Sequence, residues 1–439
     1  MRFQSAGARR WLAGAYLLVV VVATWQRGVV SREHTTFAIF RQSFVHLVAH
    51  QDLYAIYGDE QGPASQDLFK YSPSAAVLFA PLSVLPYAVS LFAWNLLNAA
   101  LLFWAVTRLL PGRQANLALL LLLPEVFTTI QASSSNGLIA ALMLLALMWI
   151  AQGKDARAAF AIAVGAMIKI FPLAVASVIV TRACRRRFAL TLLLAICVLL
   201  ALPLLVVPAD ELARQYQSWH AVQMHDAGDI QFGMSLIRAI REHWETELPS
   251  WAFQVAGTLL VLAPLIRRDR WSDEQFRLQF GCSLLVFTVL FNHQAERQSL
   301  VIAAVGSAVW LVTRPVSWPL AACYALALTG ATVVPYAILW LAIQGDLMGD
   351  APRRLTGALR APWARFSNRS RVIACRSCRV LVPQGSLMCP DCRAFALVRL
   401  PVPLTRLVVR LALLAAFAHA LTPEHYLFNP DSRGPVAVG

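Results

Sequence analysis

Charged residues are scarce in this chain, and their scarcity excludes an ordinary soluble protein. Asp, Glu, Lys and Arg make up 14% of the 439 residues, whereas hydrophobic residues make up 58%. Soluble domains carry about 25% charged residues. The sequence also lacks a G-x-x-x-x-G-K-[ST] loop and a G-x-G-x-x-G turn, the usual cradles for nucleotide phosphates. We therefore expect an all-α polytopic membrane protein with no nucleotide cofactor.

The charge that is present is strongly basic, at a formal net value of +15. No basic face is interleaved with aromatic side chains that could stack on bases, which argues against a nucleic-acid partner. In a membrane protein, an excess of Lys and Arg marks cytoplasmic loops that bind anionic headgroups. The 13 Trp residues fit interfacial belts. The composition thus predicts membrane lipids as partners.

No small-residue cleavage site follows the first apolar run, so residues 1–25 are not predicted to be a secretory signal peptide. Arg9 and Arg10 precede the run, which we interpret as the first membrane helix with its amino terminus inside. Taking roughly 20 residues per span, the apolar runs predict about ten to twelve membrane segments. The clearest are residues 11–25, 74–106, 114–130, 137–151, 158–180, 188–207, 251–266, 278–291, 299–313 and 318–343. The segment 74–106 contains Pro81 and Pro86, which predict an interfacial bend before the span.

The distribution of basic residues predicts two hairpins. Lys154 is inside by the positive-inside rule, and a single crossing would then place Arg185–Arg187 outside, against the rule. A hairpin over 158–181, broken at Lys169–Pro172, removes the conflict, with a tilted single helix as the alternative. Its arms of about 12 residues rise roughly 18 Å, which brings the tip into the outer half of the bilayer. A second hairpin over 318–343 keeps the basic carboxyl-terminal tail in the cytoplasm.

This topology brings the chemistry to one side of the membrane. The outer segments 26–72, 208–250 and 291–298 converge there with the tip at Lys169. A lysine at membrane depth costs a few kcal/mol, so it is usually functional, paired, or extended to the headgroups. A group transfer from a phosphate needs a base near the acceptor hydroxyl and cations near the leaving phosphate. The candidates in the outer segments are Glu33, His34, Asp52, Tyr54, Asp67, Lys70, Tyr71, His293, Glu296 and Arg297, each of which could instead be a solvated loop residue.

Several motifs follow one another in a characteristic order along the chain. Phe40–Asn98 reads FRQSFVHLVAHQDLYAIY…DLFKYSPSAAVLFAPLSVLPYAVSLFAWNLLN and is similar to the first outer loop and following helix of glycosyltransferase family 87. It carries the G/Q-D-L-Y turn, the F-x-Y-x-P motif and the P-L-x-x-L-P bend. Asn136–Leu147, Gly165–Pro172 (GAMIKIFP) and Phe291–Ala303 (FNHQAERQSLVIA) match later motifs. The resemblance covers residues 10–345.

The resemblance implies a GT-C membrane fold and an activity. Such enzymes transfer a sugar, often mannose, from a polyprenyl-phosphate donor to a lipid or glycan acceptor on the extracytoplasmic side. The family's presumed base is an Asp early in the first outer loop, where this chain has Thr35 or Thr36, so Glu33 or His34 would take the acceptor proton. Lys169 and Arg297 would hold the donor phosphate. The remaining predicted substrate-binding residues are His293, Glu296, Lys70 and Tyr71.

Four cysteines near the carboxyl terminus have the spacing of a zinc site. Cys375-x-x-Cys378 and Cys389-x-x-Cys392 form two knuckles, which predict a closed tetrahedral zinc ribbon with a structural role. Zinc thiolates favour a reducing compartment, in agreement with a cytoplasmic tail. The ribbon is not part of the family resemblance, and it suggests docking of a partner protein.

The predicted organisation is a glycosyltransferase domain at 1–345, a basic linker at 346–372, the zinc ribbon at 373–396, and an amphipathic or membrane helix with a tail at 397–439. Two other functions stay open at this point. Broken helices with a midplane lysine also suit a transporter or flippase of lipid-linked sugars. The absent Asp also suits a catalytically inactive membrane scaffold.

Overall fold

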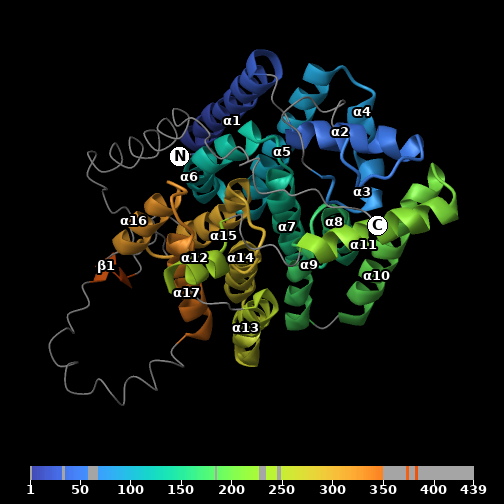
Figure 1. Ribbon diagram of the computed structural model, residues 1–439. Helices are drawn as coiled ribbons and strands as arrows, with labels where there is room; N and C mark the ends of the chain where they lie inside the picture. The colour runs from blue at the N-terminus through green and yellow to red at the C-terminus, as the bar shows by residue number, and fades with distance from the viewer. Residues whose placement is uncertain are drawn as a thin grey trace.

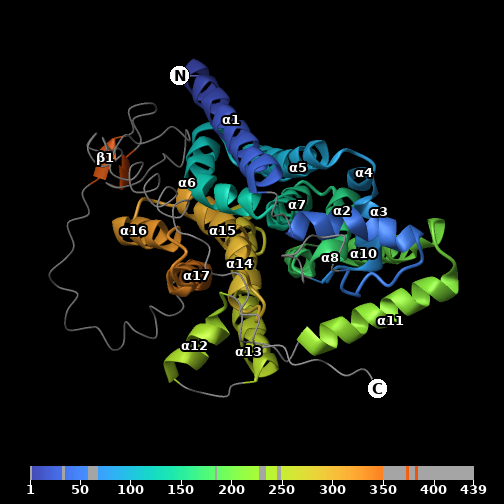
Figure 2. The ribbon, with the colours of Figure 1, turned by 45° about the horizontal axis from the view of Figure 1, so that its top comes forward.

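The computed structural model describes residues 2–31, 35–57, 68–182, 185–226, 234–244 and 249–349, together with two strands at 372–374 and 381–383. Glu33, His34, Asp67 and the four cysteines of the predicted ribbon lie outside the described residues. The described chain is a helical bundle (Figures 1 and 2). Its apolar runs are helices, as the sequence predicts.

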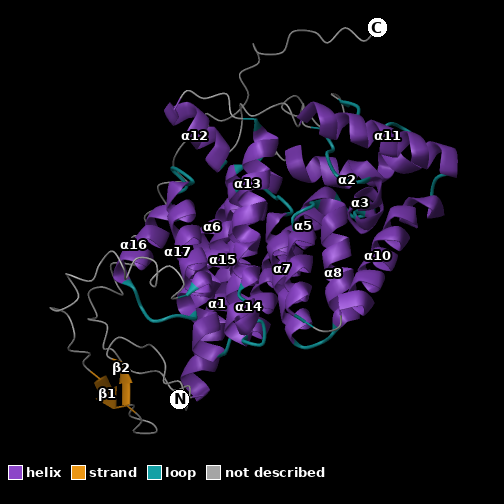
Figure 3. Ribbon diagram, turned by 90° about the horizontal axis from the view of Figure 1, so that it is seen from below, coloured by secondary structure: helices purple, strands orange, loops and turns teal. Residues whose placement is uncertain are grey.

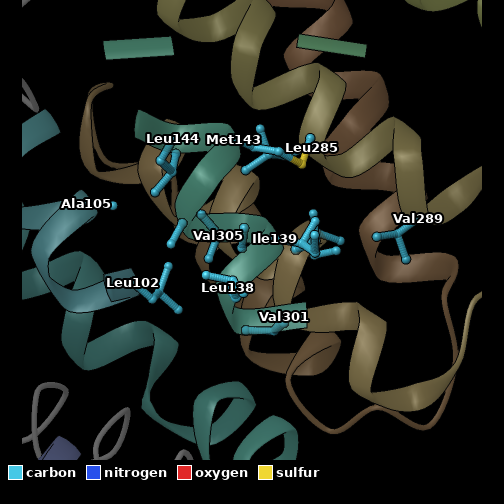
Figure 4. Packing of buried hydrophobic residues seen from close by; sticks show 14 of the residues in the cluster. Leu102, Ala105, Leu138, Ile139, Met143, Leu144, Leu285, Val289, Val301 and Val305 are labelled. Atoms are coloured by element: carbon cyan, nitrogen blue, oxygen red, sulfur yellow. The ribbon is translucent and has the colours of Figure 1, made fainter. Parts of the chain in front are cut away.

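The centre of the bundle is formed by α7 (Asn136–Ala151), α14 (Glu274–Leu290) and α15 (Leu300–Val312), with α5 (Tyr87–Leu109) and α6 (Gly112–Gln131) against them. α7 and α15 are apolar around their whole circumference and almost entirely buried, as expected of helices enclosed by others. Figure 4 shows the side chains of these helices packed together, among them Leu102, Ile139, Leu285 and Val305. Gly306 permits the closest approach, because a Cβ there would lie 2.6 Å from the carbonyl oxygen of Cys282.

Further helices surround this centre. They are α1 (Arg2–Trp25) with the π-helical Gln26–Ser31, α8 (Asp155–Ile168), α10 (Arg185–Ala201), α13 (Ser250–Leu262), α16 (Trp318–Ala327) and α17 (Val334–Met348). Among the described residues, three helical stretches are long and apolar enough to cross a membrane by length and composition: Gly7–Gly28, Tyr87–Leu109 and Arg185–Leu205. Many apolar side chains on α1, α10 and α13 are exposed, such as Trp11, Leu194 and Leu259, which fits helices that face lipid.

The predicted bend before the span of residues 74–106 is confirmed. Two short helices, α3 (Pro73–Leu78) and α4 (Ala80–Ser83), precede the long α5, whose amino-terminal cap is Pro86. Ser72 caps α3 by accepting a hydrogen bond from the Ala75 amide, and Pro73 occupies the first helical position, where its missing N–H costs nothing.

The first predicted hairpin is confirmed. α8 ends at Ile168, Lys169 is extended, and α9 (Pro172–Val175) continues into a 3-10 helix at Ala176–Thr181. Arg182, after the returning arm, donates to the carbonyl oxygens of Ile150 and Ala151 at 2.7 and 3.1 Å, at the end of α7 from which α8 departs. The chain therefore returns to the end of the bundle at which the hairpin began.

The second hairpin is also confirmed, by α16 and α17. Arg314, just before α16, lies 3.6 Å from Asp346 in the last turn of α17. Arg270 donates to the carbonyl oxygens of Asp346 and Leu347 at 3.0 and 3.2 Å, which satisfies carbonyls that a helix terminus leaves without partners. Both arms of the hairpin thus meet the arginine-rich end of the bundle.

Two of the predicted outer loops contain helices that the sequence analysis did not expect. The segment 26–72 includes α2 (Thr35–Val48), and 208–250 includes α11 (Ala209–Asp226) and α12 (Leu236–Trp244). α11 and α12 are more polar than the bundle helices, and α2 has only 14 residues, so a search for long apolar runs does not find them. Figure 3 shows α2 and α11 at the end of the bundle opposite the amino terminus.

The carboxyl-terminal region is described at two short strands. β1 (Val372–Ala374) pairs antiparallel with β2 (Leu381–Pro383), with Ile373 opposite Val382. The residues between the two strands, 375–380, include the first predicted cysteine knuckle.

Candidate functional site

Lys169 lies at the break between α8 and α9, and its ammonium group contacts α7. Nζ donates to Oδ1 of Asn136 at 2.9 Å and lies 5.8 Å from the centre of the Phe171 ring. Asn136 is fully buried, and its own Nδ2 donates to Oγ of Ser134 at 3.2 Å. Among the described residues, no carboxylate forms an ion pair with Lys169. The lysine is therefore oriented by a neutral amide that leaves its charge unmatched.

The surroundings of Lys169 favour an anion. Asn136 is the first residue of α7, and the amino terminus of a helix carries a partial positive charge. The amino terminus of α7 repels an ammonium group, whereas an anion would be attracted both by this terminus and by the Lys169 ammonium. The α7 terminus itself is partly closed, because Asn98 Oδ1 accepts from the Leu138 amide at 2.8 Å. Lys169 is consequently the stronger anion-binding group at this position.

The first outer segment reaches the hairpin tip through Ser72. The Ser72 amide and hydroxyl both donate to the carbonyl oxygen of Met167, at 3.2 and 2.7 Å. This carbonyl belongs to the last turn of α8, where the helix break leaves acceptors without intrahelical partners. Ser72 thereby places its neighbours Lys70 and Tyr71 beside the Lys169 hairpin.

Tyr71 is part of an aromatic cluster. Its ring centre lies 4.9 Å from that of Phe40 and 5.4 Å from that of Phe69. Its carbonyl oxygen accepts from the Tyr54 hydroxyl at 2.8 Å. Burial is the main cause that raises the pKa of Tyr54 above its ordinary value, with the charges of Tyr216 and Asp52 adding to it. Tyr54 is consequently a neutral hydrogen-bond donor that fixes the chain at Tyr71.

α11 fastens the same segment from the outer side. Gln215 Oε1 accepts from the Leu53 amide at 3.1 Å, and its Nε2 donates to the Gln51 carbonyl at 2.8 Å. Trp219 and Gln223 both donate to the Lys70 carbonyl, at 3.1 and 3.0 Å. The backbone of Lys70 is thus held in place, while its side chain is exposed.

The segment 291–299 is the third part of the site. His293 Nδ1 shares a hydrogen bond of 2.9 Å with Gln254 Nε2 of α13, and the Met234 amide donates to the Ala295 carbonyl. Glu296 is exposed, and its carboxylate attracts the Lys169 ammonium across the site without an ion-pair contact. Hydrogen bonds among the described residues therefore join the segment 208–250 to both 26–72 and 291–298, and the first segment is also bonded to the Lys169 hairpin.

Arg297 has a partner that the sequence analysis missed. Its Nη1 lies 2.6 Å from Oε2 of Glu125, which is fully buried in α6. Gly330, at φ +64° between α16 and α17, packs against the guanidinium, and a Cβ there would lie 2.1 Å from Nε. The sequence did contain a signal for this partner. Glu125 is a carboxylate in the apolar segment 114–130, and a charge there is as costly at membrane depth as Lys169.

Pro124 explains how Glu125 is accommodated in α6. Proline lacks an N–H and disturbs the preceding turn, so nearby carbonyls need other donors. The hydroxyls of Tyr16 and Tyr324 donate to the carbonyls of Leu119 and Leu121, at 3.0 and 3.3 Å. Side chains of α1 and α16 thus stabilise the irregular turn that presents Glu125 to Arg297.

The comparison with known families matches this part of the chain. The sequence model of glycosyltransferase family 87 matches residues 69–292, which is half of the chain. The chain belongs to glycosyltransferase family 87. No curated protein matches it. The matched range contains Lys70, Tyr71, Glu125 and Lys169 and ends directly before His293.

As a family 87 member, the protein is a membrane glycosyltransferase. The structure places Lys70 and Tyr71 on a segment bonded to the Lys169 hairpin, and the charge of Glu296 acts on Lys169 without an ion-pair contact. Arg297 is directed to Glu125, and His293 to Gln254. Among the described residues, no group of three or more His, Cys, Asp or Glu side chains is suited to hold a metal ion.

Proposed function

We propose that this family 87 glycosyltransferase uses a polyprenyl-phosphate sugar as donor and that Lys169 binds the donor phosphate. One observation carries the proposal: a largely buried lysine, held by Asn136 at the positive end of α7, has no ion-pair partner among the described residues. Such a cation is costly in the membrane unless an anion completes the site. A lipid phosphate supplies that anion at the depth of the hairpin tip.

The reaction is a displacement at the anomeric carbon of the sugar. The acceptor oxygen forms a bond to this carbon, the bond to the phosphate oxygen breaks, and the phosphate leaves with the electron pair. Lys169 stabilises the charge that grows on the leaving phosphate, which accelerates transfer because the interaction strengthens in the transition state. The acceptor proton passes to Glu33 or His34, the bases implied by the resemblance.

The other predicted residues receive roles from their contacts. We assign Glu296, whose charge acts on Lys169, to orienting the ammonium group or an acceptor hydroxyl. Lys70 and Tyr71 border the site from the first outer segment, and His293 lies on the segment 291–299, where it is held by Gln254. We assign Arg297 to Glu125 and retain Lys169 as the principal phosphate ligand.

The finer features of the enzyme also belong to this proposal. We assign it a GT-C architecture, mannose as the sugar, a lipid or glycan acceptor, and a site on the extracytoplasmic side. The orientation rests on the arginines at the ends of two helices. Arg182 donates to the last carbonyls of α7, and Arg267 and Arg270 donate to the last carbonyls of α17. Basic residues favour the cytoplasmic side. The carboxyl-terminal tail would then be cytoplasmic.

The four cysteines are proposed to hold structural zinc. Support comes from the antiparallel pair β1–β2, which encloses the segment of Cys375 and Cys378, as the strands of a zinc ribbon do. Zinc content of the purified protein tests this. About one equivalent in the wild type, lost on Cys375→Ser, is expected for a four-cysteine site. An unchanged content in the variant would contradict it.

Glycosyl transfer in proteoliposomes tests the proposed activity. Labelled polyprenyl-phosphate mannose is the donor and a membrane lipid extract supplies acceptors, with Lys169→Ala as the comparison. We expect label to move into lipid or glycan with the wild type and not with the variant. Donor binding without transfer by the wild type would instead support the inactive scaffold. Movement of the intact donor across the bilayer would support the flippase.

A further inference from the structure

We propose that Glu125 is a positioning residue that fixes the segment 296–299, and with it the exposed Glu296. This inference rests on the proposed function of Lys169 as the phosphate ligand. Glu125 itself does not touch the predicted substrate. It acts through Arg297, which is the neighbour of Glu296 in the chain.

The segment is attached to α6 at two points. Arg297 Nη1 lies 2.6 Å from Glu125 Oε2, and Thr129 Oγ1 donates to the Gln298 carbonyl at 2.9 Å. Glu125 and Thr129 are four residues apart on α6 and therefore lie on the same face, one turn apart. Because the two attachments are on consecutive residues, Arg297 and Gln298, they fix both the position and the rotation of the segment 296–299.

The ion pair gives this attachment its direction. Glu125 is fully buried, and 19% of the Arg297 side chain is exposed, so the two charges interact with little screening by water. Arg297 is drawn inward to α6 and Gly330. Glu296, which immediately precedes it with extended backbone, is exposed. The contact of Arg297 with buried Glu125 thus determines where the exposed, neighbouring Glu296 lies.

The second hairpin takes part in the same arrangement. Gly330 lies at its tip, where its backbone packs on the guanidinium. The hydroxyl of Tyr336 in α17 is buried near Glu125 and has no hydrogen-bond partner in the described part of the chain. Nothing else described near Glu125 carries a positive charge besides Arg297. The position of the site segment therefore depends on a pair that the hairpin encloses.

The test separates positioning from general stability. Glu125→Gln leaves a buried arginine without its charge partner and is expected to lower the melting temperature. Glu125→Leu combined with Arg297→Met removes both charges, and apolar replacement of a buried pair commonly restores stability. The double variant lacks a directional contact, so the segment should stay displaced even when the melting temperature has recovered.

Two measurements report the position. Hydrogen exchange of the peptide containing 292–299 should increase in the double variant. The preference of the protein for undecaprenyl phosphate over undecaprenol, measured by native mass spectrometry, should fall about tenfold, as for other residues that act through a ligand-binding group. Glu242→Gln, which breaks the 2.6 Å Arg238–Glu242 pair on α12, is the control and should change neither.

A variant without a buried charge covers the case in which the double variant does not fold. Thr129→Val removes the second attachment and should shift both measurements in the same direction by a smaller amount. Faster exchange with a reduced preference supports the inference. Wild-type exchange in the double variant, or in Thr129→Val if that alone folds, overturns it. If the wild type shows no preference for the phosphate, the proposed function fails, and hydrogen exchange alone decides the role of Glu125.

Discussion

The two hairpins of the bundle present a cation in opposite ways. At the tip of the α8–α9 hairpin, Lys169 meets a neutral amide, Asn136, and forms no ion pair with any residue that the structure describes. At the tip of the α16–α17 hairpin, Gly330 covers Arg297, whose charge is matched by buried Glu125. The comparison indicates a division of labour between two kinds of cation. Arg297, which is ion-paired, holds the chain in place, whereas Lys169, which has no ion-pair partner among the described residues, can bind an anionic ligand.

The largest expected effect comes from breaking the matched pair. Arg297→Gln leaves Glu125 buried and without a cation, which should destabilise the protein by about 3–5 kcal/mol. Thermal unfolding in detergent or nanodiscs measures the change. Asp210→Asn on α11 is the control, because Asp210 and its partner Arg214 are both exposed and the loss should be small. A wild-type melting temperature for Arg297→Gln would show that the pair does not stabilise the bundle.

Removal of the unmatched charge should affect chemistry instead of stability. Lys169→Gln deletes no ion pair of the described structure, so the melting temperature should stay near that of the wild type. Transfer should fall by about 100- to 1,000-fold, as for the loss of one preorganised donor to a developing anion. A steady-state assay with the labelled donor measures the rate. A variant that is destabilised but fully active once folded would contradict the division of labour.

Gly330 offers a way to disturb the second tip without altering a charge. Its φ of +64° disfavours any residue with a Cβ, and that Cβ would also meet Arg297. Gly330→Ala should destabilise the protein by at least about 1–2 kcal/mol. Gly345→Ala, on α17 with nothing within 4 Å of its Cβ, is the matched control and should be neutral or slightly stabilising. Equal melting temperatures for the two variants would argue against close packing of Gly330 on Arg297 at the tip of this hairpin.

The smallest effect is expected at Asn136. Asn136→Ala removes the acceptor that orients Lys169 and should weaken binding of undecaprenyl phosphate by about fivefold, or about 1 kcal/mol. The charge itself remains, so Asn136→Ala should retain more binding than Lys169→Gln. A titration of the lipid phosphate in nanodiscs measures both. A loss in Asn136→Ala as large as in Lys169→Gln would mean that the amide contacts the ligand directly.

Much of this arrangement could be predicted from the sequence. Lys169 was recognisable because it is a single charge in an apolar stretch, and both hairpins followed from the positions of Lys154, Arg185–Arg187 and the basic tail. The convergence of the outer segments followed from that topology. These features are visible because membrane insertion penalises charge so strongly that each charged residue constrains the path of the chain.

The contacts of the site could not be obtained in the same way. The pair between Glu125 and Arg297 joins distant segments, and hydropathy carries no information on which charges meet. Glu125 was missed because the segment 114–130 was interpreted as a plain span despite its carboxylate. α11 and α12 were missed because amphipathic helices are not long apolar runs. The predicted bases Glu33 and His34 lie outside the described residues, so their role stays a prediction.

The most direct test of the central claim is a comparison of two lipids on one protein. Native mass spectrometry would measure the affinities of wild type and Lys169→Gln for undecaprenyl phosphate and for undecaprenol, which differ in the phosphate alone. We predict that the wild type prefers the phosphate and that Lys169→Gln loses this preference while still binding undecaprenol. An undiminished preference in Lys169→Gln would show that Lys169 does not bind the donor phosphate.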